Sequence, residues 1–216
     1  MTGTDPYAIA LFIAALTLMP LILITTTSFL KISIVLLIVR NALGVQQVPP
    51  TLALHAMALM MTAFVMAPTL RQMADVVQEL RSAPAAQQQT LVQSAGAVVE
   101  PLRRFMLRHT KAEQRDVFLE KARKLWGEAH SKDATSKDFL ILVPAFMISQ
   151  MQAGFEMGFL IYVPFLVIDV LVSNILLALG MQMMSPMTLS VPLKLFLFVV
   201  VDGWGKLLNS MLDSYL

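Results

Sequence analysis

The sequence predicts an all-α protein of membrane type, built from proline-kinked hydrophobic helical hairpins with a small soluble helical insert. Three observations predict this class. The 216 residues are 57% hydrophobic and 14% charged, whereas soluble domains have about 45–50% apolar and about 25% charged residues. Apolar runs reach or exceed the roughly 20 residues with which a helix spans a bilayer. Twelve of the sixteen Lys and Arg residues and nine of the fourteen acidic residues fall within residues 71–138. The sequence therefore divides into residues 1–70, 71–138 and 139–216.

Composition excludes several functional classes. The chain has no Cys, so disulfides, thiolate catalysis and Cys-ligated zinc are excluded. Its net charge of +2 is not typical of a nucleic-acid-binding protein. The N-terminus carries Asp5 where a secretory signal would carry Lys or Arg, and the apolar run continues past signal length. We therefore expect this segment to be retained.

Residues 1–70 predict an N-terminal hydrophobic helical hairpin. The apolar run at residues 7–39 contains one charge, Lys31, and is too long for one upright helix. We expect a kink at Pro20 or at the hydroxyl cluster of residues 25–28, because Ser and Thr can satisfy the backbone of a bent apolar helix. Gly44 suits a left-handed helix cap. A second helix at residues 51–67 is expected to bend at Pro68.

Residues 71–138 predict the polar helical insert. The polar stretch at residues 84–96 is typical of a loop, and residues 131–137 of a hinge. Between them, helical spacing relates two groups of apolar residues. These are Leu102, Phe105 and Met106, and then Phe118, Ala122 and Leu125. Glu120 and Lys124 are placed for an i,i+4 ion pair. The insert is rich in basic residues, but it is too long for the positive-inside rule to give its side of the membrane.

Residues 139–216 predict the C-terminal hydrophobic helices. We expect three apolar segments, at residues 139–163, 164–181 and from 191 towards 212, separated by prolines. The prolines are Pro144, Pro164, Pro186 and Pro192. A Met-rich turn, GMQMMSP at residues 180–186, joins the second and third segments. No internal repeat relates the two apolar regions, which disfavours an inverted-repeat transporter.

Charged residues inside the apolar segments are the first candidate functional group. Each costs roughly 2.5–3.5 kcal/mol on insertion scales, so each is expected to be paired, hydrated or functional. The set is Lys31, Glu156, Asp169, Lys194, Asp202 and Lys206. They fit either the lining of a hydrated cavity or buried and intersubunit ion pairs that specify assembly. We favour ion pairs, because so few helices cannot bury this many charges alone.

The sequence supports an enzymatic function less well than it supports ion pairs. Asp169 and Asp202 are two carboxylates in apolar surroundings, as in an intramembrane aspartyl protease. However, Lys206 follows Asp202 by one helical turn and would neutralise it. His55, His109 and His130 stand apart from one another without metal-ligand spacing. We therefore predict no catalytic, cofactor-binding or metal-binding residues, and no enzyme.

The Met-rich turn is the second candidate functional group. In the simpler interpretation it is a turn buried in lipid. Alternatively, several copies around an axis would form a ring of flexible thioethers. Such a ring would exclude ions and water by dewetting and would yield to a moving polypeptide.

Five blocks of this sequence resemble one known family. The blocks are SFLKISIVLLIVRNALGVQQVPP, PLRRFMLRHT, GFLIYVPFLVIDVLVSN, ALGMQMMSP and PLKLFLFVVVDGW. Together they resemble the export-apparatus proteins of type III secretion systems, called FliP in flagella and SctR, YscR, HrcR or SpaP in injectisomes. The resemblance covers about residues 15–210. The GVQQVPP block and the lack of a signal-peptide pattern look more like the injectisome branch.

The resemblance implies a role in protein export. Members of this family form a ring of about five copies, joined by SctS-type and SctT-type subunits into a cone-shaped helical export gate with which an SctU-type switch protein associates. The gate lies in the secretion-system base at the bacterial inner membrane and passes unfolded polypeptides. The polar insert would be extracytoplasmic, and no member is catalytic.

The family's methionine seal maps onto Met181, Met183 and Met184. Gln182 departs from the consecutive methionines of flagellar relatives, and would either point away from the pore axis or polarise the seal. The alternative to an export-gate subunit is a self-contained membrane channel or transporter.

Overall fold

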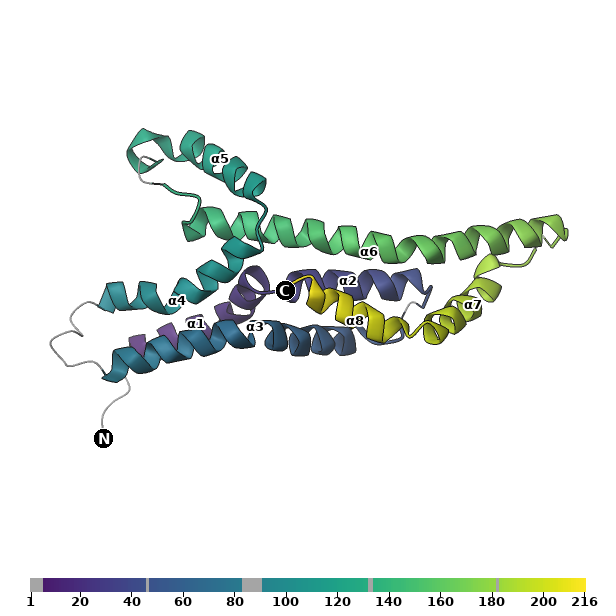
Figure 1. The fold of residues 1–216 in the computed structure, drawn as a ribbon, viewed down its shortest axis with the longest axis horizontal. Helices are drawn as coiled ribbons and strands as arrows, with labels where there is room; N and C mark the ends of the chain where they lie inside the picture. Colours follow the sequence, from purple (N-terminus) through teal and green to yellow (C-terminus); the bar gives the residue numbers. More distant parts are fainter. Residues whose placement is uncertain (1–5, 46, 83–90, 132–133, 182) are drawn as a thin grey trace. The chain divides into compact units, whose positions relative to one another are not determined.

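A computed structural model describes residues 6–45, 47–82, 91–131, 134–181 and 183–216 (Figure 1). Within these residues all regular elements are helices, which confirms the predicted all-α class. The helices are α1 (Pro6–Thr26), α2 (Phe29–Ala42), α3 (Thr51–Ser82), α4 (Leu91–Arg108), α5 (Ala112–Ser131), α6 (Phe139–Ala178), α7 (Pro186–Val200) and α8 (Gly203–Asp213).

The chain groups into two compact units that interleave along the sequence. Unit 1 comprises Met1–Leu30 and Met66–Ser149, and unit 2 comprises Lys31–Val65 and Gln150–Leu216. The division into residues 1–70, 71–138 and 139–216 stays a prediction about organisation.

The core of unit 1 lies where α4 meets the start of α6. Met106, Leu142 and Phe146 are fully buried, and Leu102 and Phe105 pack against them. The helical spacing of the apolar residues in α4 therefore does mark its buried face. Residues 91–96, expected to be loop, belong to α4. Leu91, Gln93 and Ala95 in this stretch are good helix formers.

Unit 2 is built around the packing of α2 against α6. One stripe of α2 is buried, formed by Ile32, Val35, Leu36 and Val39. Another side of α2, at Ile34 and Ile38, faces Gly154 and Gly158 of α6, which lack side chains at the contact. A Cβ at Gly158 would lie 2.5 Å from Ile38 Cδ1, and one at Gly154 would lie 3.3 Å from the Lys31 carbonyl oxygen. The two glycines thus allow the helices to approach closely.

The predicted break between the first two helices is confirmed. α1 ends at Thr26 and α2 begins at Phe29. At the break, Thr25, Thr26 and Thr27 donate hydroxyl hydrogen bonds to the carbonyls four residues earlier, at 2.6–2.9 Å. These bonds satisfy backbone groups at the point where the helix ends.

The predicted helix boundaries at Pro68 and Pro164 are wrong, while the bend expected at Pro68 stays a prediction. α3 continues through Pro68 to Ser82, and α6 runs through Pro144 and Pro164 as one 40-residue helix. A proline within a helix loses one backbone hydrogen bond, whereas ending the helix leaves four N–H and four C=O groups unpaired. In apolar surroundings the single loss is the smaller cost.

Of two predictions for the insert, one is confirmed and one is wrong. Lys124 and Glu120 form the predicted ion pair at 2.5 Å. Leu125, expected on the buried face of its helix, is 80% exposed. α5 has non-helical backbone angles at Gly127, two residues later, so the buried stripe is not continued beyond Ala122.

Two described helices, α3 and α6, are long and apolar enough to cross a membrane. Two further helix pairs, α1 with α2 and α7 with α8, pass the same test as bent pairs. The described part of the chain therefore offers two to four spans, which fits a membrane protein.

Candidate functional site

The Met-rich turn joins α6 to α7 in a defined conformation. Gly180 has a φ of +72°. Its N–H donates to the Leu177 carbonyl at 3.0 Å, and the Met181 N–H donates to the Leu176 carbonyl at 2.9 Å. This pair of bonds is a Schellman motif, which ends a helix with glycine in the left-handed conformation. Pro186 then begins α7, where its missing N–H costs nothing.

The three candidate seal residues all project from this turn into solvent. Met183 is fully exposed, and Met181 and Met184 are each 40% exposed. The Met184 N–H donates to the Met181 carbonyl at 3.2 Å, so the methionines lie on a closed turn. Gln182 lies outside the described residues. The turn therefore presents thioether side chains on a short connection fixed at both ends.

Lys194 joins three helices of unit 2. It is 4% exposed. Its Nζ contacts Asp169 Oδ2 at 2.5 Å and donates to the carbonyl of Ala42 at 3.1 Å. Asp169 lies on α6, Lys194 on α7 and Ala42 at the end of α2. This cation thus has both an ionic partner and an unpaired helix-end carbonyl.

Lys31 is buried by a different arrangement. Its Nζ donates to Ser214 Oγ at 2.6 Å and lies 4.4 Å from the centre of the Tyr215 ring. No carboxylate lies within ion-pair distance of Lys31 in the described ranges. The Tyr215 hydroxyl donates to Gln150 Oε1 at 2.7 Å. Burial raises the pKa of the Tyr215 phenol far above its usual range, so the hydroxyl stays protonated and able to donate.

The other candidate charges are exposed. Glu156, Asp202 and Lys206 are exposed and form no ion pair with described residues. Asp202 has a φ of +53° at the start of α8, and its carboxylate lies against Gly205. The Lys206 side chain, one turn later, does not reach it. The structure thus joins Lys194 to Asp169 within one chain, and it shows no ion pair for Glu156, Asp202 or Lys206 with the residues it describes.

The two candidate aspartates have different surroundings in the described part of the chain. The Asp169 carboxylate is engaged by Lys194, and Asp202 lies at the start of another helix. Among the described residues, no three His, Asp or Glu side chains are grouped to hold a metal ion.

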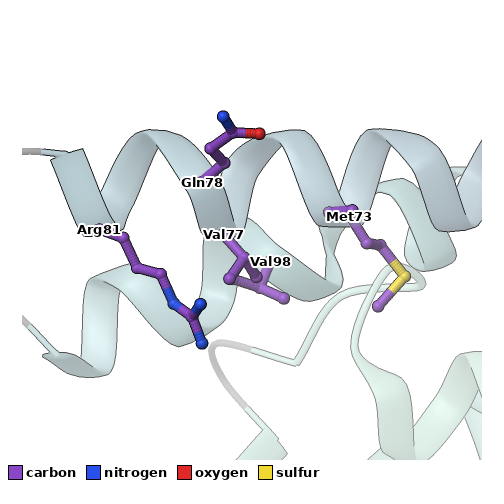
Figure 2. Close-up of a pocket in the computed structure, with 6 residues that line it drawn as sticks. Met73, Val77, Gln78, Arg81 and Val98 are labelled. Atoms are coloured by element: carbon purple, nitrogen blue, oxygen red, sulfur yellow. The ribbon is translucent and has the colours of Figure 1, made fainter.

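A shallow hollow lies between α3 and α4 in unit 1 (Figure 2). Six residues line it, namely Met73, Ala74, Val77, Gln78, Arg81 and Val98. Arg81 is the single charged residue among them, so the lining offers no acid–base pair.

Four contacts of these sites were not anticipated from the sequence. They involve the Ala42 carbonyl, Gln150, Ser214 and Tyr215. A backbone carbonyl carries no sequence signal. The i, i+4 spacing of Leu207, Met211 and Tyr215 is a signal that could have placed the Tyr215 ring on a buried face, where a phenol needs a partner.

The FliP family model matches residues 12–211. The chain belongs to the FliP family. This confirms the resemblance inferred from the five sequence blocks.

Named members of the FliP family are similar to this chain over nearly its whole length. Harpin secretion protein HrpW of Pseudomonas syringae pv. syringae is 51% identical over 210 residues, which cover 96% of this chain and 100% of the relative. Harpin secretion protein HrcR of Erwinia amylovora is 49% identical over 214 residues, or 98% and 97% of the two chains. Yop proteins translocation protein R of Yersinia pestis is 39% identical over 211 residues, again 98% and 97%. The relatives of this chain are thus secretion and translocation proteins.

Proposed function

We propose that this chain is a core subunit of the export gate of a type III secretion system in the bacterial inner membrane. Several copies surround a channel through which unfolded proteins are exported, and the methionines of the turn between α6 and α7 seal it. The observation that carries the proposal is this turn. It fixes three exposed methionines between a Schellman motif and a helix-starting proline.

The chemistry of the turn supports a seal. Met183, fully exposed in one chain, would be an apolar side chain in water without partners. Around an axis, the methionines of neighbouring copies would cover one another. Thioether side chains are flexible and polarisable and adapt to irregular surfaces. A narrow apolar ring also excludes water and ions by dewetting. The ring would therefore close when empty and yield to side chains of different size.

The apolar surface of unit 2 supports assembly. Large side chains are exposed along α3 and α6, among them Met60, Phe64, Phe159 and Leu160. Exposed apolar surface of this extent is typical of a protein or membrane interface. We infer that further copies of the chain, together with SctS-type and SctT-type subunits, cover part of it. An SctU-type protein and unfolded substrates complete the proposed set of partners.

The test replaces Met181, Met183 and Met184 together with Ala. The complexes are assembled with their partner subunits in inner membranes, and ion conductance is measured with export blocked. We expect normal assembly and a raised ion leak, because alanine leaves the constriction wider and hydrated.

The control is Met19→Ala, which removes an exposed methionine from α1 and should leave conductance unchanged. Unchanged conductance in assembled triple-alanine complexes would contradict the seal. A channel activity of the purified chain alone would instead favour a self-contained channel.

A further inference from the structure

Glu156 is an exposed carboxylate within an apolar stripe of α6. Gly154 and Gly158, on either side of it in sequence, face α2, so Glu156 points away from that contact. Along its own face follow Phe159, 63% exposed, and Leu160, 67% exposed. α6 is also one of the helices apolar enough to cross a membrane. A carboxylate on such a surface requires a cation or water.

Lys206 is the exposed cation of unit 2. α8 buries Leu207 and Met211 and presents Lys206 on the opposite side. In the described part of unit 2, Lys31 and Lys194 are buried and Arg40 is half-buried, which leaves Lys206 as the fully accessible Lys or Arg. Arg40 also lies two residues from Ala42, whose carbonyl is at the Lys194–Asp169 pair. The Arg40 guanidinium is also engaged, because it donates to Thr51 Oγ1 at 2.8 Å.

Two contacts bracket Lys206 and Glu156 within one stretch of unit 2. α7 and α8 turn back along α6 (Figure 1), held by Lys194 to Asp169 at one end and by Tyr215 to Gln150 at the other. Glu156 lies about two-thirds of the way from Asp169 to Gln150, and Lys206 somewhat over half of the way from Lys194 to Tyr215. α7 and α8 are bent by 64° to one another, and along this bent path Lys206, like Glu156 on α6, falls between the two anchoring contacts.

We propose that Glu156 of one copy pairs with Lys206 of the neighbouring copy in the homo-oligomer. This inference rests on the proposed self-assembly. Copies related by rotation about an axis lie side by side without a shift along it, so residues at one level meet. Within a chain the two side chains lie on different helices and form no ion pair. Across the interface, Glu156 would supply the anion and Lys206 the cation of an ion pair.

The charges around Lys206 would also fix the register of the copies. Asp202 precedes Lys206 by one turn and Asp213 follows it by two. A neighbour displaced by a turn or two along α8 would bring Glu156 opposite a carboxylate, and like charges repel. The acid–base–acid order on α8 thus favours one alignment of neighbouring copies.

The experiment uses the natural absence of Cys. One full-length chain carries E156C and a differently tagged chain carries K206C, and the two are co-expressed with the partner subunits and oxidised in membranes. We expect a disulfide-linked pair bearing both tags. The matched control replaces K206C with D213C, which lies on the same exposed side of α8 but about 10 Å further along, and should give little product.

Charge reversal provides the second measurement. E156K and K206E should each lower the yield of oligomer by about tenfold, and the double reversal should restore it to within about twofold. Native mass spectrometry that shows oligomers, without the E156C–K206C link or with equal D213C product, would overturn the pairing while self-assembly stands. Monomers alone for the unmodified chain, with partner subunits present, would overturn both.

Discussion

At the scale of single residues, this protein handles buried cations in two ways. Lys194 has a carboxylate and a carbonyl as partners. Lys31 has a hydroxyl and an aromatic ring. Both side chains hold the C-terminal helices of unit 2 against earlier parts of the chain. The charges that the sequence places in apolar surroundings thus connect elements far apart along the chain.

Lys194→Met should therefore destabilise the protein. The change leaves the Asp169 carboxylate and the Ala42 carbonyl without their donor. Removing one partner of a fully buried pair costs about 3–5 kcal/mol, and partial exposure of Asp169 lowers our expectation to about 2–3 kcal/mol. Denaturant unfolding in detergent measures this loss.

Lys124→Met is the control, because it also breaks a Lys–carboxylate pair but at a side chain that is 73% exposed. Its expected cost is below about 1 kcal/mol. Equal effects of the two substitutions would show that the Lys194 contacts contribute little to stability.

At the scale of elements, close packing of α2 on α6 determines unit 2. Ile34 and Ile38 of α2 meet Gly154 and Gly158 of α6, so the missing side chains of the glycines let the two helices approach closely. The same approach brings the end of α2 to Lys194, and so connects packing to the charge contacts. Unit 2 therefore depends on small residues at positions where α6 is otherwise apolar and bulky.

Gly158→Ala should disturb this packing. The added Cβ would lie 2.5 Å from Ile38 Cδ1 and 3.1 Å from its Cβ and Cγ2. Overpacking of this kind costs about 1–3 kcal/mol. The expected result is a lower Tm in detergent and a smaller yield of assembled complex.

Gly96→Ala tests whether glycine replacement as such has this effect. Gly96 is within α4, and nothing lies within 4 Å of a Cβ added there. It should be neutral or stabilising by up to about 1 kcal/mol. If Gly158→Ala were equally harmless, the helices would have room to separate.

At the scale of the whole molecule, the chain combines membrane-type helices with a polar insert. α3 and α6 are long and apolar enough to cross a bilayer, and each passes from one compact unit into the other. The polar helix α5 lies wholly in unit 1. The two long apolar helices are therefore among the three described helices, with α2, that pass from one unit into the other.

Membranes containing this chain should retain it during alkaline carbonate extraction. The reason is the apolar length of α3 and α6, whose burial in hydrocarbon does not depend on ionic contacts. Immunoblotting of the pellet and supernatant measures the partition, with a peripheral membrane protein as the control. Release of this chain together with that control would contradict a spanning arrangement.

Much of the fold was predictable because it depends on local properties. Apolar length predicted the membrane class, the hydroxyl cluster predicted the break before Phe29, and Gly180 with Pro186 predicted a tight turn. The division expected at Pro164 was wrong, because the effect of a proline on a helix depends on what surrounds the helix. The pairing of Lys194 with Asp169 was also beyond prediction, since the chain offered several opposite charges at similar sequence separations.

The sequence by itself thus determined the helical class, the polar insert, the methionines of the turn and membership of the FliP family. These follow from composition and from neighbours within a few residues. Tertiary structure alone decided which charges are buried, which pair and which remain for another chain. The burial and pairing of charges depend on distances between helices that are remote in sequence. Side-chain packing sets those distances, as at the contact of Gly158 with Ile38.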